Sequence, residues 1–310
     1  MHRTFPVVFL ASALTACARD AAAPRRDDAG ATPRAELVYE GYPSGAPELF
    51  RIAGDGSAPA RMLPAGSVAM DPEPSPDGRR IAFVVASYDS STGDVWMVNA
   101  DGTGLRRLTD DPELDDSPSW SPDGRTIVFR SYRAQRAGDL WTLDVEHGTL
   151  VNLTPAEGPG VIDHRRPAWS PDGARIAFAS TEGGDWGIWT MRADGTDRRQ
   201  LTNTIDLDAE AAWSPDGRFI AFRRSSPEQG SDIMIVPAAG GNAFRLALPG
   251  EQRTPAWHPD GTRIAFASQA TFAARPELFT MRPDGGDVQR VTREDTWGGG
   301  LNPAWRRTDR

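Results

Sequence analysis

The sequence contains no lysine, because all 34 basic side chains among its 310 residues are arginine. Mechanisms that use a lysine Schiff base or a P-loop lysine are therefore excluded. A single cysteine, Cys17, excludes internal disulfides, CxxC redox chemistry and thiolate zinc sites. With 43 acidic residues against 34 arginines, the formal net charge is −9, and the arginines are scattered along the chain rather than clustered. We therefore expect no nucleic-acid partner, which would require a positive stripe to neutralise phosphates.

The first 36 residues differ from the rest of the chain. A basic start at Arg3 precedes the apolar stretch 5–14, which is too short to span a bilayer. Leu-Thr-Ala then stands before Cys17, a pattern similar to a bacterial lipobox, so we expect a signal peptide over residues 1–16 and lipid attachment at Cys17. The alternative is an ordinary secretory signal with an incidental cysteine. The polar, proline- and alanine-rich residues 17–36 are expected to form a flexible tether.

From residue 37 onward the chain repeats one unit. Its most regular part is Ser-Pro-Asp-Gly, with histidine in place of serine in the last copy, and the aspartates lie 46, 49, 44 and 44 residues apart. The five copies begin at Ser75, Ser121, Ser170, Ser214 and His258. A tryptophan directly precedes four of them, Pro74 precedes the first, and an apolar triplet such as Ile81-Ala82-Phe83 follows each. Such a period indicates a repeat architecture.

Each copy predicts four short antiparallel strands. Alternating apolar residues rich in β-branched and aromatic side chains predict the strands. Pro-Asp-Gly predicts a tight turn, in which proline sets φ and glycine accepts a positive φ. The 31 glycines and 26 prolines, about 18% of the chain, are too many for a protein of long helices. Four strands in about 45 residues are typical of a propeller blade.

The two ends of the repeat region predict how the ring closes. Residues 37–63 match the second to fourth strands of a blade, with no first strand before them. Residues 302–305, Asn-Pro-Ala-Trp, match a first strand with nothing after it. Together the two fragments complete one blade beside the five full copies. We therefore predict an all-β fold, a six-bladed β-propeller over residues 37–306, with the ring closed by the C-terminal strand joining the N-terminal blade.

The repeated unit Pro-Ala-Trp-Ser-Pro-Asp-Gly, followed by Ile-Ala-Phe, resembles the WD-like propeller repeat of the TolB family. It resembles the propellers of prolyl-oligopeptidase-type peptidases more loosely. The resemblance covers residues 37–306 and implies a propeller that binds partners in the bacterial envelope. TolB is soluble and periplasmic and has an α/β domain ahead of its propeller, whereas this chain is expected to be lipid-anchored and its tether is too short for such a domain. What that domain does in the Tol system does not carry over.

Residues that all blades share are expected to serve the fold. The tryptophans and phenylalanines pack blade against blade, and the Pro-Asp-Gly aspartates belong to turns on one face. The opposite face collects the second-to-third strand loops and the connections between blades, where the copies differ, so we expect the ligand site there. Stepping three residues back from the tryptophan position gives one polar residue per blade: Asp71, Ser117, Arg166, Glu210, Thr254 and Asn302.

A second set of charged residues precedes these positions: Asp115, Asp116, His164, Arg165, Asp208 and Arg253. Opposed acids and arginines are suited to grip a peptide, and the alternative is a solvated rim of mutually neutralising charges. Calcium is a further alternative, because Asp206, Asp208 and Glu210 alternate close to the acids 115 and 116 around the ring. The twelve-residue calcium loop is absent and Arg166 would compete, so we expect no cofactor.

Two functions from different classes follow. The leading hypothesis is a monomeric, non-enzymatic scaffold, anchored in the outer membrane and facing the periplasm, that binds an envelope protein or peptide at the mouth of the channel. Ala18, the residue after the cysteine, favours the outer membrane by analogy with lipoprotein sorting. The alternative is a propeller enzyme at the same face, such as a glycan lyase, a hydrolase or a peptidase relative. His164 is the one histidine expected there, and no HxxxH, HExxH or GxSxG motif is present.

Overall fold

The computed structural model describes residues 35–57, 59–86, 92–134, 137–155, 162–246, 248–269, 275–292 and 299–308. The expected signal peptide, Cys17 and nearly all of the tether lie outside these residues. Within the described ranges the chain forms strands, turns and loops, and no helix. These ranges accordingly contain no helix that is long and apolar enough to cross a membrane.

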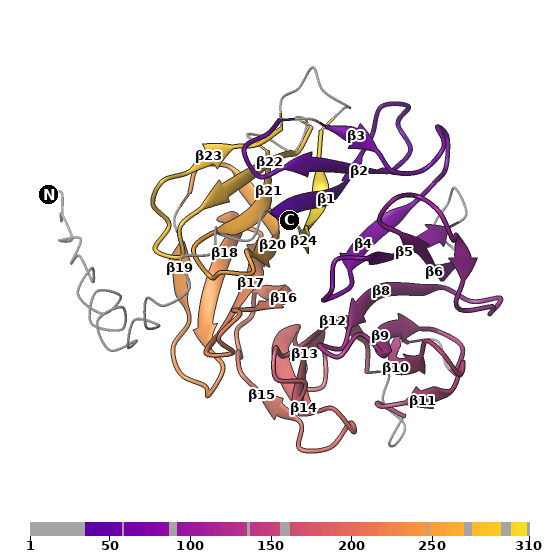
Figure 1. Ribbon diagram of the computed structural model, residues 1–310. Helices are drawn as coiled ribbons and strands as arrows, with labels where there is room; N and C mark the ends of the chain where they lie inside the picture. The colour runs from indigo at the N-terminus through magenta and orange to yellow at the C-terminus, as the bar shows by residue number, and fades with distance from the viewer. Residues whose placement is uncertain are drawn as a thin grey trace, which may run out of the picture. The chain divides into compact units, whose positions relative to one another are not determined.

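The strands form six four-stranded antiparallel sheets arranged around a ring (Figure 1). We call the sheets blades 1 to 6 in chain order. Blade 1 consists of β24 (Leu301–Arg307), β1 (Ala35–Gly41), β2 (Glu48–Ala53) and β3 (Ala60–Arg61). Blade 2 consists of β4 (Met70–Pro74), β5 (Arg80–Ala86), β6 (Gly93–Asn99) and β7 (Arg106–Arg107). Blade 3 consists of β8 (Asp115–Trp120), β9 (Thr126–Ser131), β10 (Asp139–Asp144) and β11 (Leu150–Asn152).

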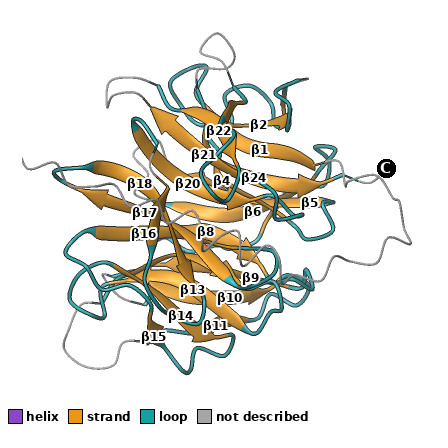
Figure 2. Ribbon diagram, turned by 90° about the vertical axis from the view of Figure 1, so that its left-hand side faces the viewer, coloured by secondary structure: helices purple, strands orange, loops and turns teal. Residues whose placement is uncertain are grey.

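The remaining three blades repeat the same order, with the first strand of each nearest the centre of the ring. Blade 4 consists of β12 (His164–Trp169), β13 (Arg175–Ser180), β14 (Gly187–Arg192) and β15 (Arg199–Gln200). Blade 5 consists of β16 (Leu207–Trp213), β17 (Phe219–Ser226), β18 (Gly230–Pro237) and β19 (Phe244–Leu246). Blade 6 consists of β20 (Glu251–Trp257), β21 (Ile264–Gln269), β22 (Glu277–Met281) and β23 (Gln289–Arg290). Figure 2 shows the blades from the side, with loops gathered at the strand ends.

Blade 1 closes the ring as the repeat predicts. The C-terminal strand β24 pairs antiparallel with β1, in a register that places Leu37 opposite Trp305 and Val38 opposite Ala304. β24 also contacts the inner strands β4 and β20 of the two adjacent blades. The all-β six-bladed propeller and its closure by the last strand are therefore confirmed.

The Pro-Asp-Gly turns have the predicted conformation. The five glycines that end these motifs have φ values from 68° to 74°, and each donates its N–H to the carbonyl oxygen of the motif's first residue at 2.8 to 2.9 Å. The aspartate side chain accepts hydrogen bonds within its own turn. Asp123, for example, accepts from the Ser121 hydroxyl at 2.6 Å and from the Arg125 amide at 3.1 Å. Each turn is thus stabilised locally.

The hydrophobic core lies at the junctions between blades. Within the described residues, each of the six buried clusters combines side chains from two neighbouring blades. Phe222 of blade 5 packs with Ile188 of blade 4, and Leu37 of blade 1 packs with Leu278 of blade 6. Burial of a side chain of this size contributes about 1.5 to 3 kcal/mol. Packing between neighbours therefore holds the ring together, at the closing junction as elsewhere.

Candidate functional site

One residue in each innermost strand adopts the left-handed backbone conformation, although none of them is glycine. Their φ values lie between 46° and 61°. They are the six positions expected from the sequence: Asn302 in blade 1, Asp71 in blade 2, Ser117 in blade 3, Arg166 in blade 4, Glu210 in blade 5 and Thr254 in blade 6. We call this set the inner ring.

A bulge accompanies each residue of the inner ring. The pairing of the first strand with the second shifts register there, as between Asp116 and Ser119 in β8 and between Arg253 and Ala256 in β20. A left-handed conformation costs a non-glycine residue roughly 1 to 2 kcal/mol. The bulge also interrupts the period-2 alternation of the strand. Because it recurs in every blade, this conformation is a property of the blade that directs one side chain per blade toward the channel.

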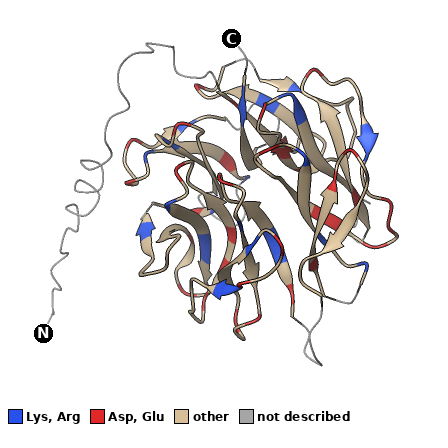
Figure 3. Cartoon of the chain, turned by 60° about the horizontal axis from the view of Figure 1, so that its bottom comes forward, with Lys and Arg blue, Asp and Glu red and all other residues tan. Residues whose placement is uncertain are grey.

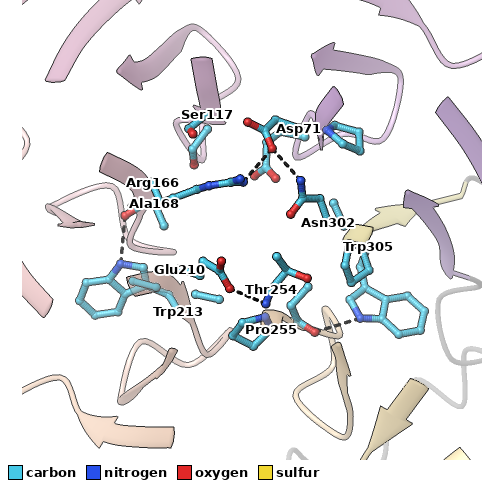
Figure 4. A pocket seen from close by; sticks show the side chains of 18 of the residues that line it. Asp71, Ser117, Arg166, Ala168, Glu210, Trp213, Thr254, Pro255, Asn302 and Trp305 are labelled. Atoms are coloured by element: carbon cyan, nitrogen blue, oxygen red, sulfur yellow. Dashed lines mark hydrogen bonds and ion pairs between the residues drawn. The ribbon is translucent and has the colours of Figure 1, made fainter. Parts of the chain in front are cut away.

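Two cavities meet at the inner ring. A cavity of about 300 Å³ runs along the channel between the inner strands, and all six ring residues line it together with prolines, alanines and tryptophans (Figure 4). A second cavity of about 580 Å³ lies at the mouth, where the β1–β2 loop contributes Tyr42 and Pro47. Asp71, Arg166, Glu210, Thr254 and Asn302 line both cavities. Five of the six inner-ring residues therefore form the floor of the mouth cavity.

Asp71 links three blades at the centre of the ring. Its Oδ1 accepts a hydrogen bond from Nη1 of Arg166 at 2.7 Å and one from Nδ2 of Asn302 at 2.7 Å (Figure 4). Burial by itself lowers the pKa of the Arg166 guanidinium, but the nearby carboxylates, Asp71 first among them, raise it above its ordinary value. Arg166 is therefore a permanent cation that is already paired across the channel.

Two further acids of the mouth, Asp116 and Glu210, have partners as well. Glu210 accepts the Thr254 backbone N–H at 2.7 Å, and its second oxygen lies 3.3 Å from Nε of Arg223. Asp116 accepts a hydrogen bond from Nε of Arg130 at 2.8 Å. Figure 3 shows acidic and basic residues interspersed over the strands and turns. Asp71, Asp116 and Glu210 are thus each paired with an arginine, and the described residues of the mouth form no wall of one charge sign.

Four of the predicted site residues lie away from both cavity linings. Asp115 and Asp208 are fully buried and form ion pairs with arginines of their own blades, Arg133 at 2.5 Å and Arg224 at 2.7 Å. His164, two residues before its ring position like these two acids, is also buried. Arg165 forms an ion pair with Asp163 at 2.7 Å and lies over the Trp186 ring, with its guanidinium carbon 3.6 Å from the ring centroid. The other eight predicted residues line the cavities.

The surroundings of His164 are those of a core histidine. Its side chain packs edge-on against Phe178, with ring centroids 5.5 Å apart, and the residue is 2% exposed. Burial, with a smaller contribution from the charge of Arg198, lowers the pKa of His164 to about 4. The imidazole is therefore neutral at physiological pH.

Four of the five acids considered for calcium, Asp115, Asp116, Asp208 and Glu210, are engaged by protein groups. Both oxygens of Asp208 accept hydrogen bonds from Arg224 at 2.7 Å, and Glu210 is held by Thr254 and Arg223. In the described part of the chain, no group of three or more histidine, cysteine, aspartate or glutamate side chains is arranged to hold a metal ion.

Glu40 and Tyr42 line the mouth cavity and were not predicted. Glu40 is 2% exposed and accepts hydrogen bonds from the Asp71 amide at 2.6 Å, from the Tyr42 hydroxyl at 2.7 Å and from the Asn302 amide group. Burial and then the charge of Asp71 raise its pKa, while these hydrogen bonds oppose the rise. Tyr42 donates to Glu40, and burial raises the pKa of its hydroxyl too.

A second comparison between the repeats could have found Glu40. It follows the apolar triplet of its blade and stands opposite the residue that precedes the inner ring. The equivalent position differs from blade to blade, and in all six blades it has this partner. The six residues are Glu40, Val84, Arg130, Ala179, Arg223 and Ala267. Variation at this position, like variation at the inner ring, marks the face where the copies differ.

Glu73 lines the narrower cavity and was also missed. It occupies the position that is alanine in four blades and serine in blade 3, one residue before Pro74, which replaces the usual tryptophan. Burial raises the pKa of its carboxyl group to about 8. Blade 2 therefore departs from the repeat at two consecutive positions, and one of them places an ionisable group in the channel.

Comparison with known proteins identifies the repeat. Residues 159–269 match a family model described as the TolB beta propeller domain. This stretch runs from just before β12 to the end of β21, and so includes three of the Pro-Asp-Gly motifs. Among proteins of curated function, none matches the sequence.

Several solved structures share the fold at low sequence identity. TolB from Acinetobacter baumannii superposes with a TM-score of 0.75 at 21% identity, over 88% of this chain and 66% of that one. A chain of a nidogen/laminin complex superposes with a TM-score of 0.70 at 11% sequence identity, over 88% of this chain and 98% of that one. A puromycin-hydrolyzing peptidase from Mycobacterium tuberculosis superposes with a TM-score of 0.58 at 17% sequence identity, over 80% of this chain and 42% of that one.

The chain spans less than two thirds of the length of TolB and under half of the peptidase. Identities of this size show the fold, and one fold hosts many functions. The repeat motifs, the six closed blades and the matched family model agree with one another. The chain is therefore a six-bladed β-propeller, and its residues 159–269 are similar to the TolB beta propeller domain.

Proposed function

We propose that this propeller is a non-enzymatic scaffold that binds a protein segment or peptide of the bacterial cell envelope at the mouth cavity. The observation that carries the proposal is the inner ring, which directs five different polar side chains, each from its own blade, into the floor of a 580 Å³ cavity. Ligand sites are typically concave, with a few polar groups that fix orientation.

The resemblance to TolB supports an envelope partner. The proposed anchor is a lipid on Cys17, with the tether holding a monomeric propeller on the periplasmic side of the outer membrane. The enzymatic alternative depends on His164, and this residue is buried against Phe178 rather than placed in either cavity. Binding is therefore the function that the geometry supports best.

Site-specific cross-linking in cells tests the proposal. A photoreactive amino acid replaces Val68, which lines the mouth cavity, or Asp172, which is exposed in a Pro-Asp-Gly turn. We expect a discrete product from residue 68 of the full chain and none from residue 172. Charge reversal by Glu210→Arg should abolish that product, whereas the matched reversal Asp172→Arg should leave it unchanged.

Equal yields from both positions, or no product from residue 68, would contradict the proposal. The two cross-linking positions leave the charges of the mouth unaltered. Their comparison therefore remains decisive even where Glu210→Arg prevents folding. Thermal melting of each purified variant separates a lost partner from a lost fold.

A further inference from the structure

Of the three arginines expected at the variable face, two have an ion-pair partner and the third has none among the described residues. Arg165 is paired with Asp163, and Arg166 is paired with Asp71, both at 2.7 Å. Arg253 lines the mouth cavity, yet within the described part of the chain it forms neither an ion pair nor a hydrogen bond, and its Nε is buried without an acceptor. A buried guanidinium N–H without a partner is costly, because water no longer solvates it.

The acids of the mouth cavity cannot supply that partner in their present arrangement. Asp71, Asp116 and Glu210 each have their own arginine. Glu40 has no cationic partner in the described ranges, but three neutral donors satisfy its two oxygens and it is 2% exposed. The pairing at the mouth therefore leaves the positive charge of Arg253 uncompensated at the cavity surface.

A second unsatisfied group lies beside Arg253. The Oγ1 of Thr254 is buried and has no hydrogen-bond partner among the residues that the structure describes, and this residue lines both cavities. Its backbone N–H is already donated to Glu210, so the hydroxyl is the group that remains for a ligand. A hydroxyl donor next to a guanidinium is suited to bind the two oxygens of an anion.

We propose that Arg253 and Thr254 bind a carboxylate of the peptide ligand, either its C-terminus or an Asp or Glu side chain. The inference rests on the proposed peptide-binding function and adds the charge of the group that is recognised. A singly charged carboxylate fits better than a doubly charged phosphate, because Glu40, Asp71, Asp116 and Glu210 line the same cavity and would repel the extra negative charge.

Peptide libraries of three kinds test the proposal on the immobilised full chain. The first has free C-termini and no acidic residues, the second has amidated C-termini with internal Asp and Glu, and the third is amidated and contains no acid. Bound peptides are quantified by mass spectrometry. We expect the first or second library, or both, to be retained at least about tenfold more than the third, the factor expected for a hydrogen bond to a charged group.

Variants assign the selectivity to the two residues. Arg253→Gln should abolish the preference for a carboxylate, Arg253→Lys should retain part of it, and Thr254→Val should weaken binding about threefold to fivefold. Arg165→Gln is the matched control, because this arginine occupies the equivalent position of blade 4 but has a partner and lies outside both cavity linings. It should change binding by less than about twofold.

The two proposals fail in different ways. Equal binding of all three libraries, or unchanged selectivity in Arg253→Gln, would overturn the carboxylate site and leave peptide binding intact. Absence of binding from every library would overturn the proposed function and the site together. Removal of the unpaired Arg253 charge should leave the melting temperature unchanged or slightly raised. A large fall would instead indicate a structural role and would overturn the proposal.

Discussion

Positive φ angles occur on both faces of the propeller, but different residues adopt them. In the Pro-Asp-Gly turns the position is always glycine, and the neighbouring aspartate bonds within its own turn. At the inner ring the position is never glycine, and side chains bond between blades, as Arg166 of blade 4 does with Asp71 of blade 2. The aspartates of the turns are therefore held within their own blades, whereas Asp71, Arg166 and Asn302 connect three blades across the channel.

The largest loss of stability should come from removing β24, the strand that blade 1 contributes to the mouth. Deletion of residues 301–310 removes β24 and exposes the edge of β1, so we expect a loss of at least about 4 kcal/mol or a failure to fold. Thermal and urea unfolding measure the effect. Deletion of residues 308–310, which lie beyond β24, should leave the melting curve unchanged. An unchanged melting curve for the longer deletion would refute closure by β24.

Neutralising one aspartate on each face compares the two networks directly. Asp71→Asn keeps a side chain that tolerates positive φ but leaves Arg166 without its counter-charge, so we expect a loss of about 2 to 3 kcal/mol. Asp172→Asn should cost less than about 1 kcal/mol, because its partners belong to one exposed turn. Equal losses in urea unfolding would show that the mouth is no more coupled than the turns.

Glu73 belongs to neither network, and its raised pKa makes the free energy of unfolding depend on pH. Its pKa is about 8 in the folded protein and near 4.3 when unfolded, so its contribution favours folding at low pH and is lost as pH rises from about 4 to 8. Glu73→Gln should therefore stabilise the protein relative to wild type progressively between pH 5 and 8, by roughly 1 to 3 kcal/mol in total. Urea unfolding at several pH values measures the difference, and a constant offset would contradict a raised pKa.

The smallest effect concerns the strain of the inner ring itself. Ser117 has a φ of 52°, and asparagine tolerates this conformation better than serine. Ser117→Asn should stabilise the fold by about 0.5 kcal/mol. Ser119→Asn, in the regular part of the same strand, should be neutral or destabilising. A loss in the first variant as large as in the second would show that residue 117 is not strained.

Repetition made the fold predictable. Five Pro-Asp-Gly copies and two complementary fragments are enough to count six blades and to locate the closing strand. The same alignment found all six inner-ring positions, because their distance from the tryptophan is constant. It could not show that Asp115, His164 and Asp208 turn away from the mouth, since the bulge at each ring residue breaks the alternation that a regular strand would continue.

Contacts across the channel could not be predicted from the repeat. The bond from Arg166 to Asp71 joins residues 95 positions apart in the chain, and it depends on how a long side chain crosses the channel. Glu40 was missed because it lies on the second strand of its blade, whereas the alignment on tryptophan follows the first strand. Arg165 and Arg166 have ion-pair partners, whereas Arg253 has none among the described residues. No property of the sequence distinguishes the three arginines in this way.

The strand pairing within blade 1 has a consequence for the order of folding. Arg306 of β24 donates to Glu36 of β1 across 270 residues of chain, at 2.6 Å. Contacts of such sequence separation form slowly, because a very long loop must close first. Until β24 arrives, β1 remains an unpaired edge open to strands of other molecules. Blade 1, the first to be synthesised, is therefore the last to be completed, and β1 is the segment most exposed to aggregation while the chain folds.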